Sequence, residues 1–174
     1  MGIRNLFVLF SFVLISGALL FSSCSSDDDN GELSQEQMIE KMLDEVRQLT
    51  KDIKTLEDAA AAGWDTDLSG CVQHPTEGGM GHHIARLEYI DGRVNYLEPQ
   101  VLLFEPQMDG SFELTGVEYI VPFAILSSDA DAPELFFHPF HQNPNQQIWA
   151  LHVWTERENP SGIFYDWNPN VSCN

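Results

Sequence analysis

Basic residues are scarce in this chain. Its 174 residues include eight lysines and arginines against 27 aspartates and glutamates, which gives a formal charge of −19. A negative field of this size repels phosphate backbones, so it excludes nucleic acid as a partner and disfavours electrostatic adhesion to anionic lipid. The sequence also lacks GxSxG, P-loop, dinucleotide-binding, HExxH and CxxCH motifs, which removes the enzyme and haem classes that those motifs mark.

Long hydrophobic runs are absent except at the N-terminus. Residues 6–21 carry no charge, follow Arg4, and form a run too short to span a bilayer. The run ends in small residues before Cys24, and this junction resembles a lipobox, although Phe21 stands where leucine is usual. The pattern predicts a signal peptide over residues 1–23 and lipid attachment at Cys24. An uncleaved anchor helix is the alternative.

Cysteine is also rare, with three residues in the chain. Acylation of Cys24 would leave one pair, Cys71 and Cys173, and such a pair should be oxidised outside the cytosol. A disulfide closing a loop of roughly 100 residues contributes about 4.7 kcal/mol in the chain-entropy model. We therefore predict a Cys71–Cys173 disulfide, with two buried free thiols as the alternative.

The segment after the predicted cleavage site is acidic. Residues 25–32 contain no apolar side chain, which predicts a disordered tether over residues 24–33. Its acidic character resembles the signals that direct some bacterial lipoproteins to the cell surface, but a plain linker explains it equally well. We expect a lipoprotein of the cell envelope, held in the outer membrane by the lipid on Cys24, with surface exposure left open.

Residues 34–174 are expected to form one domain that opens with a helix. Ser34 and Gln37 have the spacing of a capping box. Apolar residues then recur in steps of three and four over residues 39–60, and Gly63 is a natural stop. This span is long for a globular domain, so a break near Thr50 would divide it into a helix pair.

Beyond Cys71 the pattern changes to strands and turns. Asp109-Gly110 is a strong hairpin signal between two of the predicted strands. The strands are expected over residues 82–90, 101–105, 112–121 and 148–154, and a loop is expected over residues 127–147. The fold class predicted is α+β: an N-terminal amphipathic helix or helix pair packed on a mostly antiparallel sheet, with curling toward a barrel left open.

Six ordered motifs run through roughly residues 55–173. Together they resemble a family of exported bacterial hypothetical proteins with the pattern CV…GGMGxH…PxLLxEP…VGVEY…LHVW…NPxGxF…WNPxVxC. The resemblance implies no established activity. The pattern carries onto Cys71, His83, Glu105, Glu118, His152 and Cys173, whereas His82 falls on a variable position.

Three side chains stand out as candidate metal ligands. Alternation along the strand over residues 112–121 places Glu118 on a face with Leu114 and Ile120, where an unpaired carboxylate is costly. His152 lies in another hydrophobic strand, and His83 follows a glycine-rich turn that could let the backbone approach a bound group. Two imidazoles and a carboxylate form a ligand set for zinc, copper or iron.

Two other side chains are alternates in this set, Glu105 and His82, and His74 is a further substitute. If Asp109-Gly110 is a two-residue turn, Glu118 faces Val101 and Leu114 faces Glu105. The two glutamates would then lie about 13 Å apart along one face, too far to share a metal.

These observations predict an exported lipoprotein with a transition-metal or small-ligand site in the β-domain, acting without catalysis. A metal-dependent enzyme using the same residues is the first alternative. The second is a structural or interaction lipoprotein without a site, in which a buried Glu–His network satisfies the polar groups without metal. Small molecules or metal are expected ligands, and the membrane is the expected partner through the lipid anchor.

Overall fold

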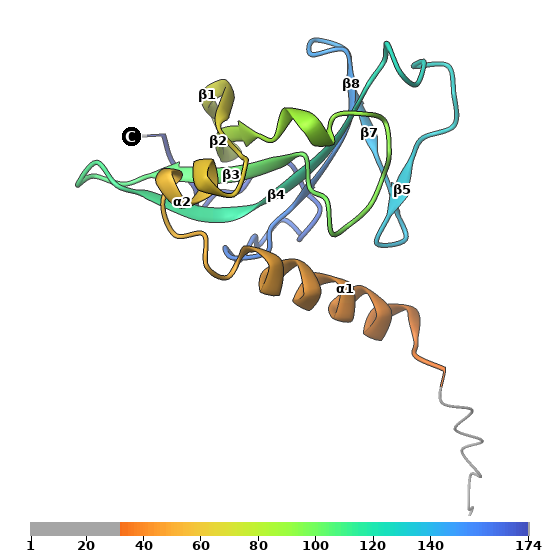
Figure 1. Cartoon of the computed structure of the whole chain (residues 1–174), viewed down its shortest axis with the longest axis horizontal. Coiled ribbons are helices and arrows are strands. Elements are labelled where there is room, and N and C mark those ends of the chain that lie inside the picture. The colour runs from red at the N-terminus through yellow and green to blue at the C-terminus, as the bar shows by residue number, and fades with distance from the viewer. Residues whose placement is uncertain (1–31, 174) are drawn as a thin grey trace, which may run out of the picture. The chain divides into compact units, whose positions relative to one another are not determined.

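The computed structural model describes residues 32–173 (Figure 1). The predicted signal peptide, the lipidated Cys24 and all but the last two residues of the predicted tether lie outside the described residues. Within them, no helix has the length and apolar character needed to cross a bilayer. The elements are α1 (Gln35–Thr50), α2 (Leu56–Ala61), β1 (Thr66–His74), β2 (Gly78–Ala85), η1 (Leu87–Tyr89), β3 (Val101–Pro106), β4 (Phe112–Pro122), β5 (Glu134–Leu135), β6 (His138–Pro139), β7 (His141–Asn143) and β8 (Ile148–Val153).

The N-terminal helical segment is a helix pair. The backbone N–H of Gln37 donates to Ser34 Oγ at 3.2 Å and the N–H of Ser34 donates to Gln37 Oε1 at 2.8 Å, which confirms the predicted capping box. Helix α1 ends at Thr50, the predicted break. The chain then restarts as α2 because Thr55 and Asp58 form a second capping box.

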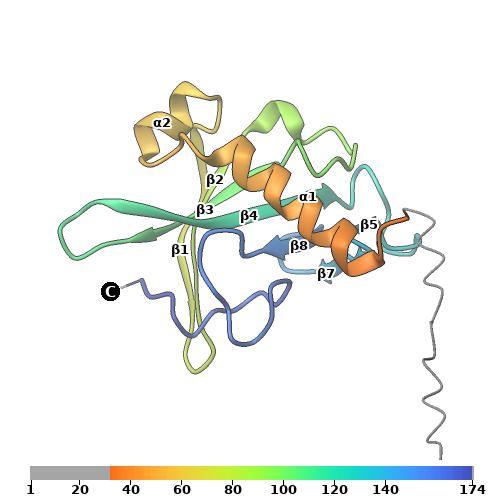
Figure 2. The same ribbon diagram turned by 90° about the horizontal axis from the view of Figure 1, so that it is seen from below.

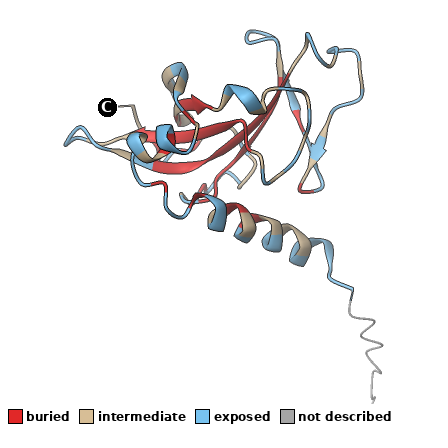
Figure 3. Ribbon diagram, viewed as in Figure 1, coloured by how far each residue is buried: buried red, intermediate tan, exposed pale blue. Residues whose placement is uncertain are grey.

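The main hydrophobic cluster contains buried side chains from α1 and from the strands. Leu43 and Val46 of α1 are buried in the same cluster as Val117 and Tyr119 of β4 and Leu151 of β8. Figure 3 shows that burial is concentrated in the central strands, while much of α1 and the connecting loops is exposed. Apolar surface removed from water in this cluster is the main stabilising contribution to such a domain.

The main sheet has six antiparallel strands in the order β1-β2-β3-β4-β8-β7, and it is curled like half a barrel (Figures 1 and 2). Strands β3, β4 and β8 match the prediction to within one residue at each end. Strand β2 begins and ends earlier than predicted. Most of β1 was not predicted, and the segment expected to be a loop over residues 127–147 holds β5, β6 and β7.

The glycines of β2 make room for the protein's own backbone. A Cβ atom on Gly78 would lie 2.0 Å from the carbonyl oxygen of Asn168, and one on Gly81 would lie 2.4 Å from that of Phe104. At these two glycines the close neighbour is therefore the protein's own backbone. The approach of Gly78 to Asn168 packs the C-terminal segment against β2, and the confirmed disulfide between Cys71 and Cys173 also holds that segment.

The β3–β4 hairpin contains two irregularities that compensate each other. Gln107 N–H donates to Ser111 O, so the turn has three residues rather than two. Glu105 therefore faces Glu113, and the predicted pairing with Leu114 is wrong. A bulge then restores the predicted register, in which Val101 faces Glu118.

Because of this bulge, the residues that share a face of β4 differ from the prediction. Leu114 packs in the main cluster with Val117, not on the side of Glu118. The face of Glu118 instead carries a second, smaller apolar cluster from four strands. Its members are Ala85, Val101, Leu103, Ile120 and Ala150.

Candidate metal centre

His83, Glu118 and His152 come together on the face of the second apolar cluster. Strand β4 pairs with β8 so that Glu118 lies directly opposite His152. His83 reaches the same point from β2, where it is paired with Leu103 of the intervening strand. All three residues are buried, with 7%, 5% and 2% of their surface exposed.

The ligand atoms of this group lie within 4.8 Å of one another, close to the spacing of ligands around a metal ion. His83 Nε2 and His152 Nε2 are 3.3 Å apart. Glu118 Oε2 lies 3.8 Å from His83 Nε2, and Glu118 Oε1 lies 3.6 Å from His152 Nε2. A tetrahedral ion with ligands at about 2.0–2.2 Å would hold them roughly 3.3–3.6 Å apart. The His83, Glu118 and His152 group could therefore hold a metal ion.

The contact between His83 and Ser69 favours one tautomer of His83. Ser69 Oγ donates its single proton to the carbonyl oxygen of Gly70 at 2.9 Å. The same oxygen lies 2.9 Å from His83 Nδ1, and while its proton is on Gly70 O it accepts the Nδ1–H. In the neutral ring, His83 Nε2 then carries a lone pair, and that atom faces Glu118 and His152.

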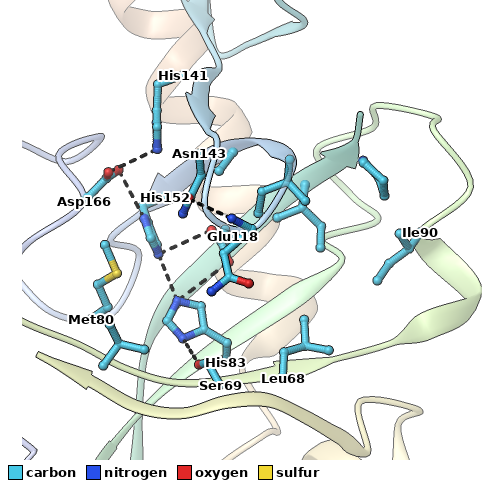
Figure 4. A pocket seen from close by; sticks show the side chains of 16 residues that line it. Leu68, Ser69, Met80, His83, Ile90, Glu118, His141, Asn143, His152 and Asp166 are labelled. Atoms are coloured by element: carbon cyan, nitrogen blue, oxygen red, sulfur yellow. Dashed lines mark hydrogen bonds and ion pairs between the residues drawn. The ribbon is translucent and has the colours of Figure 1, made fainter. Parts of the chain in front are cut away.

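Asp166 orients the second histidine in the same sense. Its Oδ1 lies 3.2 Å from His152 Nδ1, and its Oδ2 lies 3.1 Å from Nε2 of the half-exposed His141 (Figure 4). A carboxylate that accepts the outer N–H of a ligating histidine is a common supporting contact in metal sites because it fixes the ring and raises its basicity. Both inner nitrogen atoms are thus held toward one point.

The two histidines differ in their pKa. Burial lowers the pKa of His83, and although Glu118 opposes this, His152 adds to it, so the pKa stays below its ordinary value. Burial also disfavours charge on His152, but Glu118 and the hydrogen bond to Asp166 outweigh it and raise its pKa. Burial would raise the pKa of Asp166, but its contacts with His152 and His141 lower it. Of the two histidines, His152 therefore holds a proton more readily than His83.

The group lies at the wall of a cavity of about 350 Å³. Figure 4 shows His83, Glu118, His152 and Asp166 gathered on one side of it, with Leu68 and Met80 nearby. No lysine or arginine lines the cavity among the described residues. Its apolar walls include Leu68, Val72, Met80, Ile120, Ile148 and Ala150.

The alternates suggested by the sequence lie outside this group. Glu105 accepts hydrogen bonds from Arg157 Nη2 and from the backbone N–H of Ser172, each at 2.8 Å. His82 is next to His83 in β2 and therefore points to the opposite face. There its Nδ1 contacts Asp67 at 2.8 Å.

His74 is also separate from the centre. It contacts the ring of Trp167, and its Nδ1 lies 3.6 Å from Glu77.

Sequence reasoning did not find Ser69, Asp166 or His141. Ser69 lies in an irregular part of β1, between Asp67 and Cys71, where the register with β2 shifts. Asp166 occupies a variable position of the NPxGxF…W motif, and His141 lies in the segment expected to be a loop. None of them is marked by periodicity or spacing, because each is brought to the site by folding alone.

Comparisons of the chain with protein-family models, curated proteins and solved structures gave no significant match. The function is therefore argued from the chemistry of the site.

Proposed function

We propose that this protein binds a divalent transition metal through His83 Nε2, His152 Nε2 and a carboxylate oxygen of Glu118. The observation that carries the proposal is the convergence of three buried ligand atoms, with contacts from Ser69 and Asp166 on the outer nitrogen atoms of the two imidazoles. Zinc is the first choice because it accepts nitrogen and oxygen ligands and tolerates the geometry that the protein supplies. Copper and iron suit the same donors.

A cation among these three groups would relieve the repulsion between them. Two imidazole lone pairs and a carboxylate at 3.3–3.8 Å would repel one another in a buried site. A metal ion satisfies all three groups, whereas a proton on His152 satisfies them in the competing structural network. The two possibilities differ in their response to added metal.

Metal titration tests the proposal. Protein purified without chelator is analysed for metal and then titrated with zinc. Wild type should bind one equivalent, and His152→Ala should bind none. His138→Ala is the matched control, because His138 is exposed and stacks on Phe164 away from the centre. Ser69→Ala should weaken binding by about 10–100-fold, the usual effect of removing an orienting partner. No binding by the wild type would leave the proton-held network as the role of these residues.

A metal-dependent hydrolase is the second candidate. The observation that favours it is that three protein ligands face a cavity, since catalytic zinc keeps one coordination position for water or substrate. The zinc-loaded protein should then hydrolyse activated esters faster than His152→Ala. The rate should rise with pH as the metal-bound water loses its proton. Equal rates for the two proteins would leave a binding function.

We also propose that the protein is exported and held in the outer membrane of the cell envelope by lipid on Cys24. The lipobox-like junction supports this, as does the pairing of Cys71 with Cys173, which leaves Cys24 free for acylation. We further propose that α1 is a permanent layer over the sheet. The shared cluster of Leu43 and Val117 supports that arrangement.

A further inference from the structure

The cavity beside the candidate metal centre has features that select a ligand. We infer that it binds a small monocarboxylate with an apolar tail, the carboxylate on the metal and the tail against the cavity wall. This inference rests on the proposed metal site and names the ligand class for that site.

The walls select an apolar tail. Leu68 and Val72 of β1, Ile120 of β4, and Ile148 and Ala150 of β8 approach the cavity from different strands. Its volume of about 350 Å³ corresponds to roughly twelve water molecules at about 30 Å³ each. A tail of a few methylene groups therefore fits, and it would contact these walls along its length.

The charges select a single anionic head. A divalent ion with Glu118 as its one charged ligand leaves one positive charge at the remaining coordination position, and a monoanion neutralises it. Asp166 is the other acidic residue that lines the cavity, and its charge is already engaged by the ring nitrogens of His152 and His141. No lysine or arginine among the described lining residues could offset a second negative charge on the ligand. A dicarboxylate of similar length is therefore disfavoured.

Cobalt-loaded protein offers a direct test, because the visible absorption of Co²⁺ reports its ligands. The probes are acetate, hexanoate and adipate, which separate the effects of the head, the tail and a second charge. Each buried methylene contributes up to about fourfold in affinity, so hexanoate should bind at least tenfold more tightly than acetate. Adipate should bind at least tenfold more weakly than hexanoate.

The outcomes separate the two levels of the proposal. If Co²⁺ gives no spectrum and does not bind, the metal site itself is wrong. If Co²⁺ binds but none of the probes changes its spectrum, the ligand class is wrong and the metal site stands. Equal affinities for acetate and hexanoate would also overturn the inference, because the tail would gain nothing from the cavity.

A matched pair of variants tests whether the apolar tail of the ligand contacts the cavity wall. Leu68 lines the cavity and is 47% exposed, whereas Leu87 is 55% exposed and does not line it. Both can be truncated without opening the core, which unchanged melting temperatures will verify. Leu68→Ala should weaken hexanoate at least threefold and leave acetate unchanged, whereas Leu87→Ala should alter neither. Unchanged hexanoate binding in Leu68→Ala would show that the tail lies elsewhere.

Discussion

Replacing Glu118 by glutamine is the sharpest perturbation of the proposed centre. The side chain is buried, with 5% of the residue exposed, and its two oxygens lie 3.6 and 3.8 Å from the two ring nitrogens. Glutamine keeps the shape and removes the charge. Because loss of an outer partner alone weakens metal binding by about 10–100-fold, loss of this charged ligand should weaken it by at least about 100-fold.

The expected change in the zinc-induced rise in Tm follows from the linkage between zinc binding and unfolding. Zinc at 1,000 times its Kd stabilises the wild type by about 4.1 kcal/mol. In Glu118→Gln the same concentration would be about ten times the Kd and would contribute about 1.4 kcal/mol. At about 3–5 °C per kcal/mol for a domain of this size, the zinc-induced rise in Tm should fall from about 12–20 °C to about 4–7 °C.

Thermal unfolding with zinc and with chelator measures this difference. Glu105→Gln is the control, because Glu105 is also buried but contacts Arg157 and Ser172 outside the centre. That variant should have a lower Tm without zinc and keep the full zinc-induced rise. The reasoning is refuted if zinc leaves the wild-type Tm unchanged, or if Glu118→Gln shows the same rise as the wild type.

Three further outcomes are expected. The raised pKa of His152 and the lowered pKa of His83 mean that one proton competes with each metal ion as the pH falls through the pKa of His152. Zinc affinity measured by calorimetry should therefore fall about tenfold per pH unit in that window and level off above it, whereas a hundredfold fall per unit would contradict the assignment. Reduction of the Cys71–Cys173 bridge, which spans a sequence separation of 102, should destabilise the protein by up to about 4.7 kcal/mol. Unreduced peptide mapping by mass spectrometry should find the two cysteines linked, and an unchanged Tm on reduction would argue against a stabilising role. Cys24→Ser should release the protein from the membrane fraction or leave it uncleaved, and fractionation identical to wild type would exclude the lipid anchor.

The hairpin of β3 and β4 shows which features of the fold could be predicted from the sequence and which could not. Alternation and the Asp109-Gly110 signal predicted both strands and placed Glu118 opposite Val101, as the structure has it. The same reasoning placed Leu114 on the face of Glu118, which is wrong. The extra residue in the turn and the extra residue in the bulge have opposite effects on the register. Between the turn and the bulge, the residues of β4 therefore lie on the opposite face from the one predicted. The alternation of apolar residues cannot reveal the two irregularities, because together they leave the pairing of Val101 with Glu118 unchanged.

The sequence by itself determined the local features of this protein. The capping box at Ser34, the hairpin, the cysteine pairing and the three candidate ligands all follow from residue type, spacing and the cost of burying polar groups. Tertiary structure decided what surrounds those ligands. Ser69 reaches His83 from the part of β1 where the register with β2 shifts. Asp166 reaches His152 from the C-terminal segment. Such contacts join residues far apart in the chain, so only the packing of the whole sheet could place them around one point.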